Sequence, residues 1–231
     1  MSIATQTGMS RNRLNWLVVA LLVLCGFTLG LAQGSSPSEA EIRALIKQSR
    51  SKDLKVSDVA NEALSKLDAK SLPALTSILK KGRPCERLAV ARWFYEFDPN
   101  NKDLIPAMTE VATGGSLRSL FNLQEEMMCR RGAAFALALS ADGIRVLTRL
   151  LKEGDLFERQ SAIFALDDLT ETSDYPEGIL QAMKEAIPAI AKGTKEKDKT
   201  MSCMSDEVLG QIARGSNEEL SKLAKTYLHQ D

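Results

Sequence analysis

The sequence has very few of the residues on which enzymes and metal sites most often depend. Its 231 residues include a single histidine, His229, and only 5% are aromatic. One histidine near the end of the chain excludes most metal sites and most histidine-based acid–base chemistry. No phosphate-binding loop, nucleophile elbow or Cys–His arrangement occurs either. We therefore expect no catalytic residues, no metal and no cofactor, and a protein that is not an enzyme.

A net charge of one sign is also lacking. The 30 basic side chains balance 30 acidic ones, so no overall field favours nucleic acid, and we expect no nucleic-acid partner. Contact with a membrane is expected only through residues 16–32, if this segment is not cleaved. Leu, Ala, Lys and Glu are plentiful, a composition that favours helices over strands. The sequence therefore predicts an all-α fold.

Residues 1–32 have the pattern of a secretory signal peptide. Arg11 and Arg13 precede the apolar run at 16–32, and the polar stretch QGSSPS follows it. Small residues at Gly30 and Ala32 predict cleavage between Ala32 and Gln33. This pattern indicates export to the periplasm or the secreted space. The alternative is an uncleaved membrane anchor, since 17 residues are at the lower limit for crossing a bilayer.

A proline recurs inside one apolar frame along the rest of the chain. The frame reads LPAL at 72–75, IPAM at 105–108 and IPAI at 187–190, and Arg145 takes the proline position in GIRVLTRLL. Pro73 and Pro106 suit a first helical turn, whereas Pro188 should kink or split its helix. The frames are 33, 39 and 43 residues apart, a spacing typical of repeats built from helix pairs.

A second amphipathic helix follows each frame. These helices begin near Cys85, Cys129, Phe157 and Cys203. When Arg87, Arg130 and Arg159 are aligned, a small apolar residue lies three places on and a large one seven places on; these are Val90, Ala133 and Ala162, and Phe94, Leu137 and Leu166. Both offsets fall on one helical face, which we expect to be buried. Phe97 should belong to the same face.

The stretch IRVLTRLLKEGDLFERQSAIFALDDL at 144–169 resembles a HEAT repeat, of the short type also found in phycobilin lyases. The recurring IPA and the Arg-plus-Ala second helix are similar to that family's consensus over roughly 72–213. The resemblance implies an armadillo-type α–α superhelix, a HEAT-like solenoid of about four helix pairs with terminal caps. Such patterns indicate a fold and say little about activity.

The expected organisation has four parts. They are the signal peptide or anchor at 1–32, a linker and N-terminal helical cap at 33–70, the repeats at 71–215, and a C-terminal capping helix at 216–231. Ser36 and Glu39 should form a capping box at the first helix. An insertion of about eleven residues near 114–123 interrupts the second repeat. A single domain is the simplest arrangement.

The three cysteines outside the signal occupy equivalent positions at the start of second helices. We expect them to be small buried packing residues; the alternative is a disulfide between Cys85 and Cys129. Such a bridge requires Cα atoms within about 7 Å, whereas packed helices lie about 8–10 Å apart. A catalytic or metal role for these thiols has no partner residue in the sequence.

Candidate binding residues lie on the second helices and in the insertion. Arg87, Arg92, Arg130, Arg131 and Arg159 could line a groove or instead tie adjacent repeats together. Trp93 lies off the apolar stripe, so it is either an exposed interface anchor or a ring packed under the preceding unit. Leu117 and Phe121 either fold back on the core or face a partner.

These observations favour an exported, non-enzymatic scaffold or adaptor. Its partner would be a protein or peptide bound on the stacked second helices, with Arg92, Trp93, Leu117, Phe121 and Arg131 as contact residues. Two alternatives are a lyase-like or cofactor-handling repeat protein, which the resemblance suggests, and a membrane-anchored structural subunit of an envelope complex.

Overall fold

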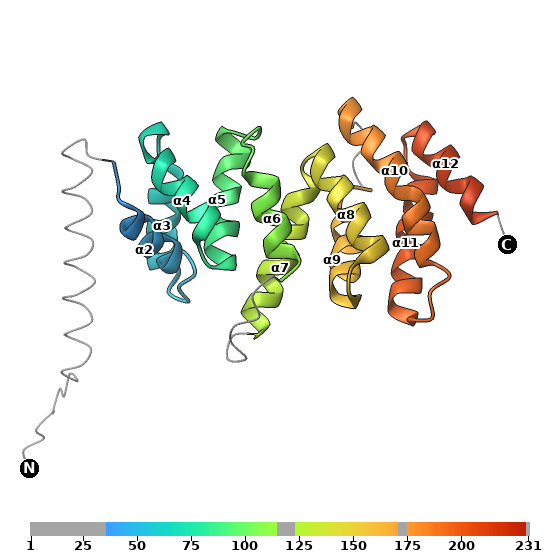
Figure 1. The fold of residues 1–231 in the computed structure, drawn as a ribbon, viewed down its shortest axis with the longest axis horizontal. Helices are drawn as coiled ribbons and strands as arrows, with labels where there is room; N and C mark the ends of the chain where they lie inside the picture. Colours follow the sequence, from blue (N-terminus) through green and yellow to red (C-terminus); the bar gives the residue numbers. More distant parts are fainter. Residues whose placement is uncertain (1–35, 115–122, 171–174, 230–231) are drawn as a thin grey trace, which may run out of the picture. The chain divides into compact units, whose positions relative to one another are not determined.

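The protein is helical throughout the part of the chain that the structure, a computed structural model, describes: residues 36–114, 123–170 and 175–229 (Figure 1). Within these ranges it has α-helices and one 3₁₀ turn and no β-strand, so the all-α prediction is confirmed. The chain forms two compact units, with the boundary between Ala74 and Leu75. The predicted signal peptide and the predicted cleavage site between Ala32 and Gln33 lie outside the described residues.

The first unit contains a pair of helices in mutual contact, α2 (Glu39–Gln48) and α3 (Leu54–Ser65), followed by a 3₁₀ turn at Ala69–Ser71. The predicted capping box at Ser36 and Glu39 is wrong by two residues. Ser38 is the N-cap of α2, and its backbone N–H donates to Glu41 Oε2 at 2.7 Å. This bond from Ser38 lowers the pKa of Glu41 below its usual value. Ser38 satisfies the same S-x-x-E pattern four residues before Ile42, the first buried residue of the helix.

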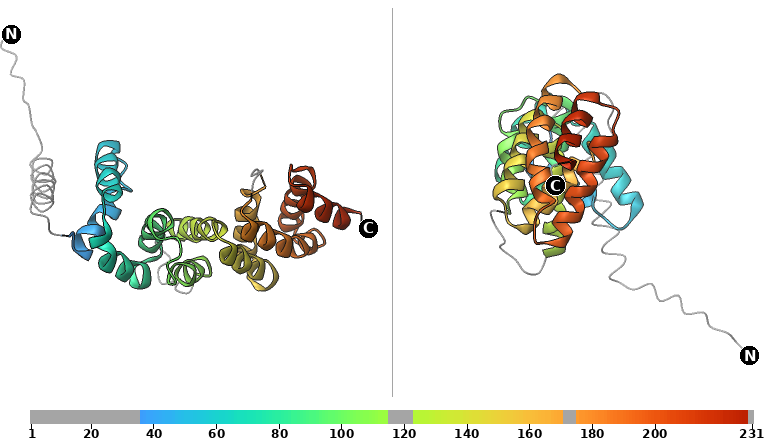
Figure 2. Two further views of the ribbon diagram at one scale, coloured as in Figure 1. Left: turned by 90° about the horizontal axis from the view of Figure 1, so that it is seen from above. Right: turned by 90° about the vertical axis from the view of Figure 1, so that its right-hand side faces the viewer.

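The second unit consists of helices that follow one another in chain order (Figures 1 and 2). They are α4 (Leu72–Lys81, which contains the unit boundary), α5 (Pro84–Phe97), α6 (Leu104–Ala112), α7 (Leu123–Ala138), α8 (Ala141–Glu153), α9 (Leu156–Asp167), α10 (Glu177–Gly193), α11 (Lys199–Arg214) and α12 (Glu218–Leu228). Each predicted frame corresponds to a first helix, α4, α6, α8 or α10. The predicted second helices correspond to α5, α7, α9 and α11.

Contacts within the second unit run along two rows. The second helices touch in order, α5 with α7, α7 with α9, and α9 with α11. The first helices do likewise, α6 with α8, α8 with α10, and α10 with α12. Each of α6, α8 and α10 also packs against the second helix that follows it. This two-row packing is what repeated helix pairs require in order to bury their apolar faces.

The aligned positions of the second helices form the core of this unit. Val90, Ala133 and Ala162 are all fully buried, and so are Phe94, Leu137 and Leu166, as the periodicity predicts. The prediction for Phe97 is wrong, since this side chain is 52% exposed. Phe97 is the last residue of α5, and no further helical turn covers it.

The prolines separate into two structural settings. Pro73 and Pro106 lie in the first turns of α4 and α6, where a missing N–H leaves no bond unmade. Pro188 does not split its helix, because α10 is continuous from Glu177 to Gly193. Pro188 is exposed, so water can solvate the carbonyl group that loses its helical hydrogen bond.

None of the helices at 36–114, 123–170 and 175–229 is long and apolar enough to cross a membrane.

Candidate binding face on the second helices

Arg87 joins three helices of the second unit. It is buried on α5, and its Nε donates to the Leu79 carbonyl oxygen at 2.9 Å, near the C-terminal end of α4. Its Nη2 donates to the Ala107 carbonyl oxygen at 3.2 Å and to Glu110 at 2.8 Å, both on α6. This bond lowers the pKa of Glu110 below its ordinary value, with an additional coulombic contribution from Arg87. One side chain therefore caps its own repeat and binds the next.

Arg130 repeats this arrangement one pair later. Its Nε donates to the Ala112 carbonyl oxygen at 3.1 Å, at the end of α6, and its guanidinium faces Glu158 of α9 at 3.6 Å. Arg159 of α9 binds Glu196, beyond α10, through Nη1 at 2.6 Å. The Arg159 Nε lacks a hydrogen-bond partner among the described residues, so the carbonyl contact is not repeated there. All three aligned arginines tie neighbouring repeats together.

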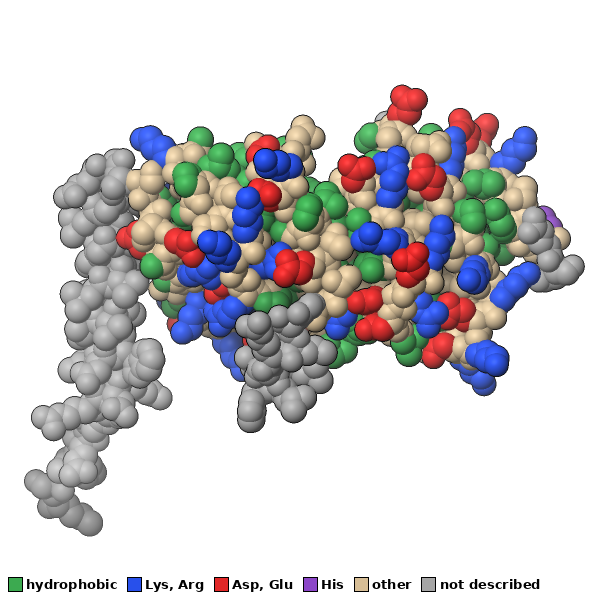
Figure 3. Space-filling model, viewed as in Figure 1, with side chains coloured by type: hydrophobic (Ala, Val, Ile, Leu, Met, Phe, Trp, Pro, Cys, Tyr) green, Lys and Arg blue, Asp and Glu red, His purple; other side chains and the backbone are tan. Residues whose placement is uncertain are grey.

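We call the contacts of Arg87, Arg130 and Arg159 the arginine ladder. The other two candidate arginines, Arg92 and Arg131, do not belong to it and are exposed. Acidic and basic side chains are interspersed over the face shown in Figure 3, in keeping with a chain of balanced charge. A binding site on this protein must therefore depend on local chemistry rather than on a broad field of one sign.

Cys85 of α5 and Cys129 of α7 form a disulfide, with Cα atoms 5.2 Å apart. The expectation of buried, unpaired thiols is wrong for this pair. It is also wrong for Cys203, which is free and exposed on α11. Gly132 explains the close approach, since a Cβ atom on it would lie 2.5 Å from Leu88 Cδ2 of α5. With no side chain at 132, the helices can approach at this point without a clash, and Cys85 and Cys129 come within bridging distance.

Trp93 is not the exposed anchor that the sequence allowed. Its side chain is partly buried. The indole packs edge-on against Phe94 and lies 4.9 Å, centroid to centroid, from Phe97. The exposed ring at this end of α5 belongs to Phe97, while Arg92 is exposed on the preceding turn. Periodicity therefore misplaces Phe97, and of the two alternatives left open for Trp93 the structure does not support the exposed anchor.

The second helices carry an exposed apolar and cationic surface. Of its residues, the sequence pattern indicated only Arg131. Its guanidinium carbon lies 5.7 Å from the Phe157 ring centroid and 5.4 Å from that of Phe164, so Arg131 of α7 bridges to two turns of α9. Phe135, one turn after Arg131, and Phe164 are each 39% exposed. We call Arg131, Phe135 and Phe164 the α7–α9 patch.

Met128 extends the patch along α7. It is exposed, and with Arg131 and Phe135 it recurs at helical spacing, so the three share one face. Leu139, which is also exposed, directly follows the last residue of α7. Exposed large apolar side chains that gather in one place, unlike scattered ones, indicate an interaction surface. The signal in the sequence was the spacing 128, 131 and 135, which the apolar core stripe of the same helix obscures.

Leu117 and Phe121, the candidates in the insertion, lie outside the described residues. The structure therefore brings together Arg131 with Phe135 and Phe164, and places Arg92 and Trp93 at the neighbouring helix α5.

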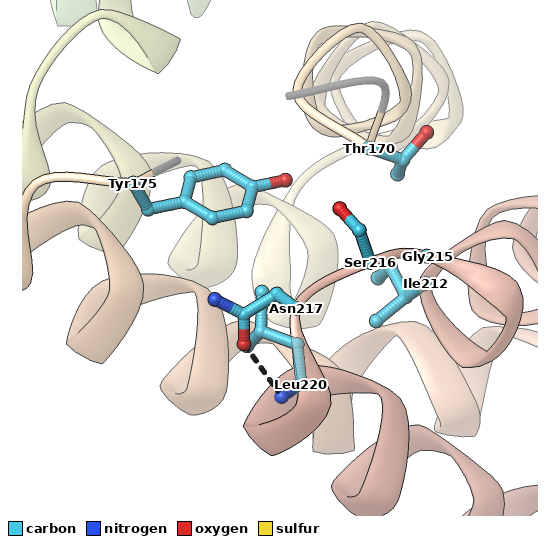
Figure 4. Close-up of a pocket in the computed structure, with 7 residues that line it drawn as sticks. All are labelled: Thr170, Tyr175, Ile212, Gly215, Ser216, Asn217 and Leu220. Carbon is cyan, nitrogen blue, oxygen red and sulfur yellow. Dashed lines mark hydrogen bonds between the residues drawn. The ribbon is translucent and has the colours of Figure 1, made fainter. Parts of the chain in front are cut away.

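A small hollow near the C-terminal end is lined by Thr170, Tyr175, Ile212, Gly215, Ser216, Asn217 and Leu220 (Figure 4). Its polar groups already serve the fold. Asn217 Oδ1 accepts from the Leu220 N–H at 3.1 Å and caps α12. The Tyr175 hydroxyl donates to the Leu169 carbonyl, and burial raises the pKa of Tyr175. The hollow therefore lies where residues that follow α9 meet the connection between α11 and α12.

No group of three or more histidine, cysteine or acidic side chains in the described ranges is arranged to hold a metal ion. No protein-family model matches the chain, and no curated protein matches it. The HEAT resemblance therefore stays a prediction from the sequence, and the geometry of the second helices is the basis for a functional proposal.

Proposed function

We propose that this protein is an exported, non-enzymatic scaffold of HEAT-like solenoid type that docks a protein or peptide partner on its second helices. The observation that carries the proposal is the α7–α9 patch, two half-exposed phenyl rings with a guanidinium held between the helices that bear them. Aromatic residues and arginine are the side chains most enriched where binding energy concentrates. The two-row packing supports the solenoid, a fold whose stacked helices form extended binding surfaces.

The arginine ladder and the disulfide support a rigid docking face. The Cys85–Cys129 bridge joins α5 to α7, Arg130 links α7 to α9, and Arg87 ties α5 to α6. A surface fixed before binding loses less conformational entropy when the partner docks. The patch therefore lies beside helices that are joined by a disulfide and by a buried arginine.

Export is supported by the same disulfide. Disulfides persist in oxidising compartments and are rare in reducing ones, and the apolar run at 16–32 has the pattern of a secretory signal. The N-terminal residue of the protein isolated from its own cells distinguishes a secreted, cleaved form from a membrane-anchored, uncleaved form. A chain that begins at Gln33 supports secretion, and an intact N-terminus supports the membrane-anchored alternative.

Photo-crosslinking tests the docking proposal. A photoreactive residue replaces Phe135 or Phe164 in the protein expressed in its own host, and a control carries it at Lys222, an exposed position on α12. We expect a discrete protein adduct from positions 135 and 164 and none from 222. The partner, identified by mass spectrometry and purified, must then bind the purified protein directly. Internal crosslinks alone from both patch positions would contradict the proposal.

A further inference from the structure

The corner between α2 and α3, in the first unit, has a composition that neither the solenoid nor the docking face explains. Leu54, the first residue of α3, is 75% exposed, and Val59 on the next turn is 49% exposed. Val56 is exposed as well, whereas Ala60 is the only buried residue of α3. A terminal helix of a repeat array normally turns a polar face outward. This corner instead presents three large apolar side chains.

Basic residues surround these apolar side chains. Lys47, Arg50, Lys52 and Lys55 are all exposed. Between positions 47 and 59 these four basic residues face two acids, Asp53 and the exposed Asp58. The carboxylate of Asp53 is the N-cap of α3, accepting from the Lys55 N–H at 3.0 Å. Lys47, Lys52 and Lys55 form no ion pair within the described ranges. The corner is therefore locally cationic on a chain whose total charge is zero.

Two of these residues do not stabilise the helix that carries them. The first turn of α3 contains no acidic residue and does contain Lys55, although the helix dipole favours negative charge at that end. Leu54, at the same end of α3, is mostly exposed and so adds little stability through burial. Residues placed against local stability are the ones for which a functional reason is expected.

The apolar run at 16–32 would hold this corner close to a lipid bilayer wherever the run itself stays in the membrane. The apolar run ends at Ala32, and only residues 33–37 separate it from the N-cap Ser38. Five residues span less than about 20 Å even when fully extended, and α2 adds about 15 Å. Whenever the run occupies a membrane, during export or permanently, the corner is held near the membrane surface.

We propose that the α2–α3 corner is a membrane-contact site: Leu54, Val56 and Val59 enter the headgroup region of an anionic bilayer while Lys47, Lys52 and Lys55 contact its phosphates. Apolar side chains ringed by lysines are the composition of peripheral lipid-binding surfaces. The site is in the first unit and is independent of the docking function proposed for α7 and α9.

An environment-sensitive fluorophore at position 54 tests this site in the full chain. The label is attached to a Leu54→Cys variant in which Cys25→Ser and Cys203→Ser leave no other cysteine outside the Cys85–Cys129 bridge. Leu54 is so exposed that the label should not disturb the fold. The protein is reconstituted into vesicles of phosphatidylcholine alone or mixed with phosphatidylglycerol. We expect blue-shifted emission, with quenching by nitroxide lipids, in the anionic vesicles only.

Charge reversal supplies the matched control. Lys52→Glu with Lys55→Glu should lower the quenching about tenfold or more, whereas Lys222→Glu with Lys225→Glu, the same change at exposed positions of α12, should leave it unchanged. Salt at about 1 M should lower the quenching as Lys52→Glu with Lys55→Glu does, because it shortens the Debye length to about 3 Å.

Three results would overturn the proposal. One is an emission maximum at position 54 that does not move in anionic vesicles. A second is an equal shift in neutral vesicles that survives charge reversal. The third is a shift that grows with protein concentration in neutral vesicles, which would mean that a second copy of the chain covers the corner.

Discussion

A Cβ atom on Gly143, the third residue of α8, would lie 1.9 Å from the carbonyl oxygen of Leu137 on α7. The connection between these helices is short, and its Ser140 caps α8 by accepting a hydrogen bond from the Gly143 N–H at 3.1 Å. The capping bond pulls the first turn of α8 onto the end of α7. No side chain fits at position 143 without moving the backbone.

Gly143→Ala should therefore lower the free energy of unfolding by about 2–3 kcal/mol, because the clash is with backbone and cannot be relieved by a rotamer change. Gly178→Ala in α10 is the matched control. Its Cβ would meet only Ala141 Cβ, at 3.6 Å, so alanine should be neutral or stabilise by up to about 1 kcal/mol. Urea unfolding of the two variants measures both effects, and equal midpoints would contradict the close approach of α7 and α8.

Reduction of the Cys85–Cys129 bridge should destabilise the second unit. The bridge closes a loop of 44 residues, for which the chain-entropy relation gives about 4 kcal/mol and measured bridges commonly give about 2–4 kcal/mol. Urea unfolding with and without dithiothreitol measures the loss. Cys203→Ser is the control, since this thiol is free and exposed, and it should leave the unfolding curve unchanged.

The arginine ladder predicts a difference between two arginines. Arg87→Met removes hydrogen bonds to the carbonyl groups of Leu79 and Ala107, and the loss should cost about 2 kcal/mol of unfolding free energy. Arg145→Met removes pairs with Asp142 and Glu185 that are exposed to solvent and should change the unfolding free energy far less than Arg87→Met. Equal effects in thermal and urea unfolding would contradict a structural role specific to Arg87.

The Arg87–Glu110 pair predicts a pH dependence. The hydrogen bond from Arg87 lowers the pKa of Glu110 from 4.5 in the folded protein. A carboxylate with a lowered folded pKa adds stability that is present above its unfolded pKa and is lost as the pH falls through the folded value. The difference in unfolding free energy between the wild type and Glu110→Gln should therefore shrink below pH 4.5. A difference that stays constant with pH would contradict the pairing.

Much of the helical organisation could be predicted from the sequence because repetition multiplies a weak signal. The second-helix alignment correctly identified Val90, Ala133 and Phe94 as buried, since a position that recurs at each repeat marks the face that every pair must cover. The proline frames located the first helices in the same way. The prediction that Phe97 is buried was wrong because periodicity does not reveal that the helix ends at that residue.

The candidate site was less predictable, for two physical reasons. The Cys85–Cys129 bridge depends on how closely α5 and α7 approach at that point. Gly132 permits the approach because it has no side chain to collide with Leu88 of α5. Arg131 meets the Phe164 ring only through the packing of α7 against α9. Their register is a tertiary property that neither helix contains alone.

The affinity of the crosslinked partner, once purified, tests the central claim most directly. We would compare the wild type with Phe135→Ser combined with Phe164→Ser, and with Leu228→Ser as the control. Leu228 is 37% exposed on α12, close to the 39% of each patch residue. The docking face predicts a dissociation constant raised by about thirtyfold or more in the double variant, since residues that dominate an interface contribute about 2 kcal/mol or more, and an unchanged constant for Leu228→Ser. Equal affinities for all three proteins, with folding intact, would contradict a binding role for the second helices.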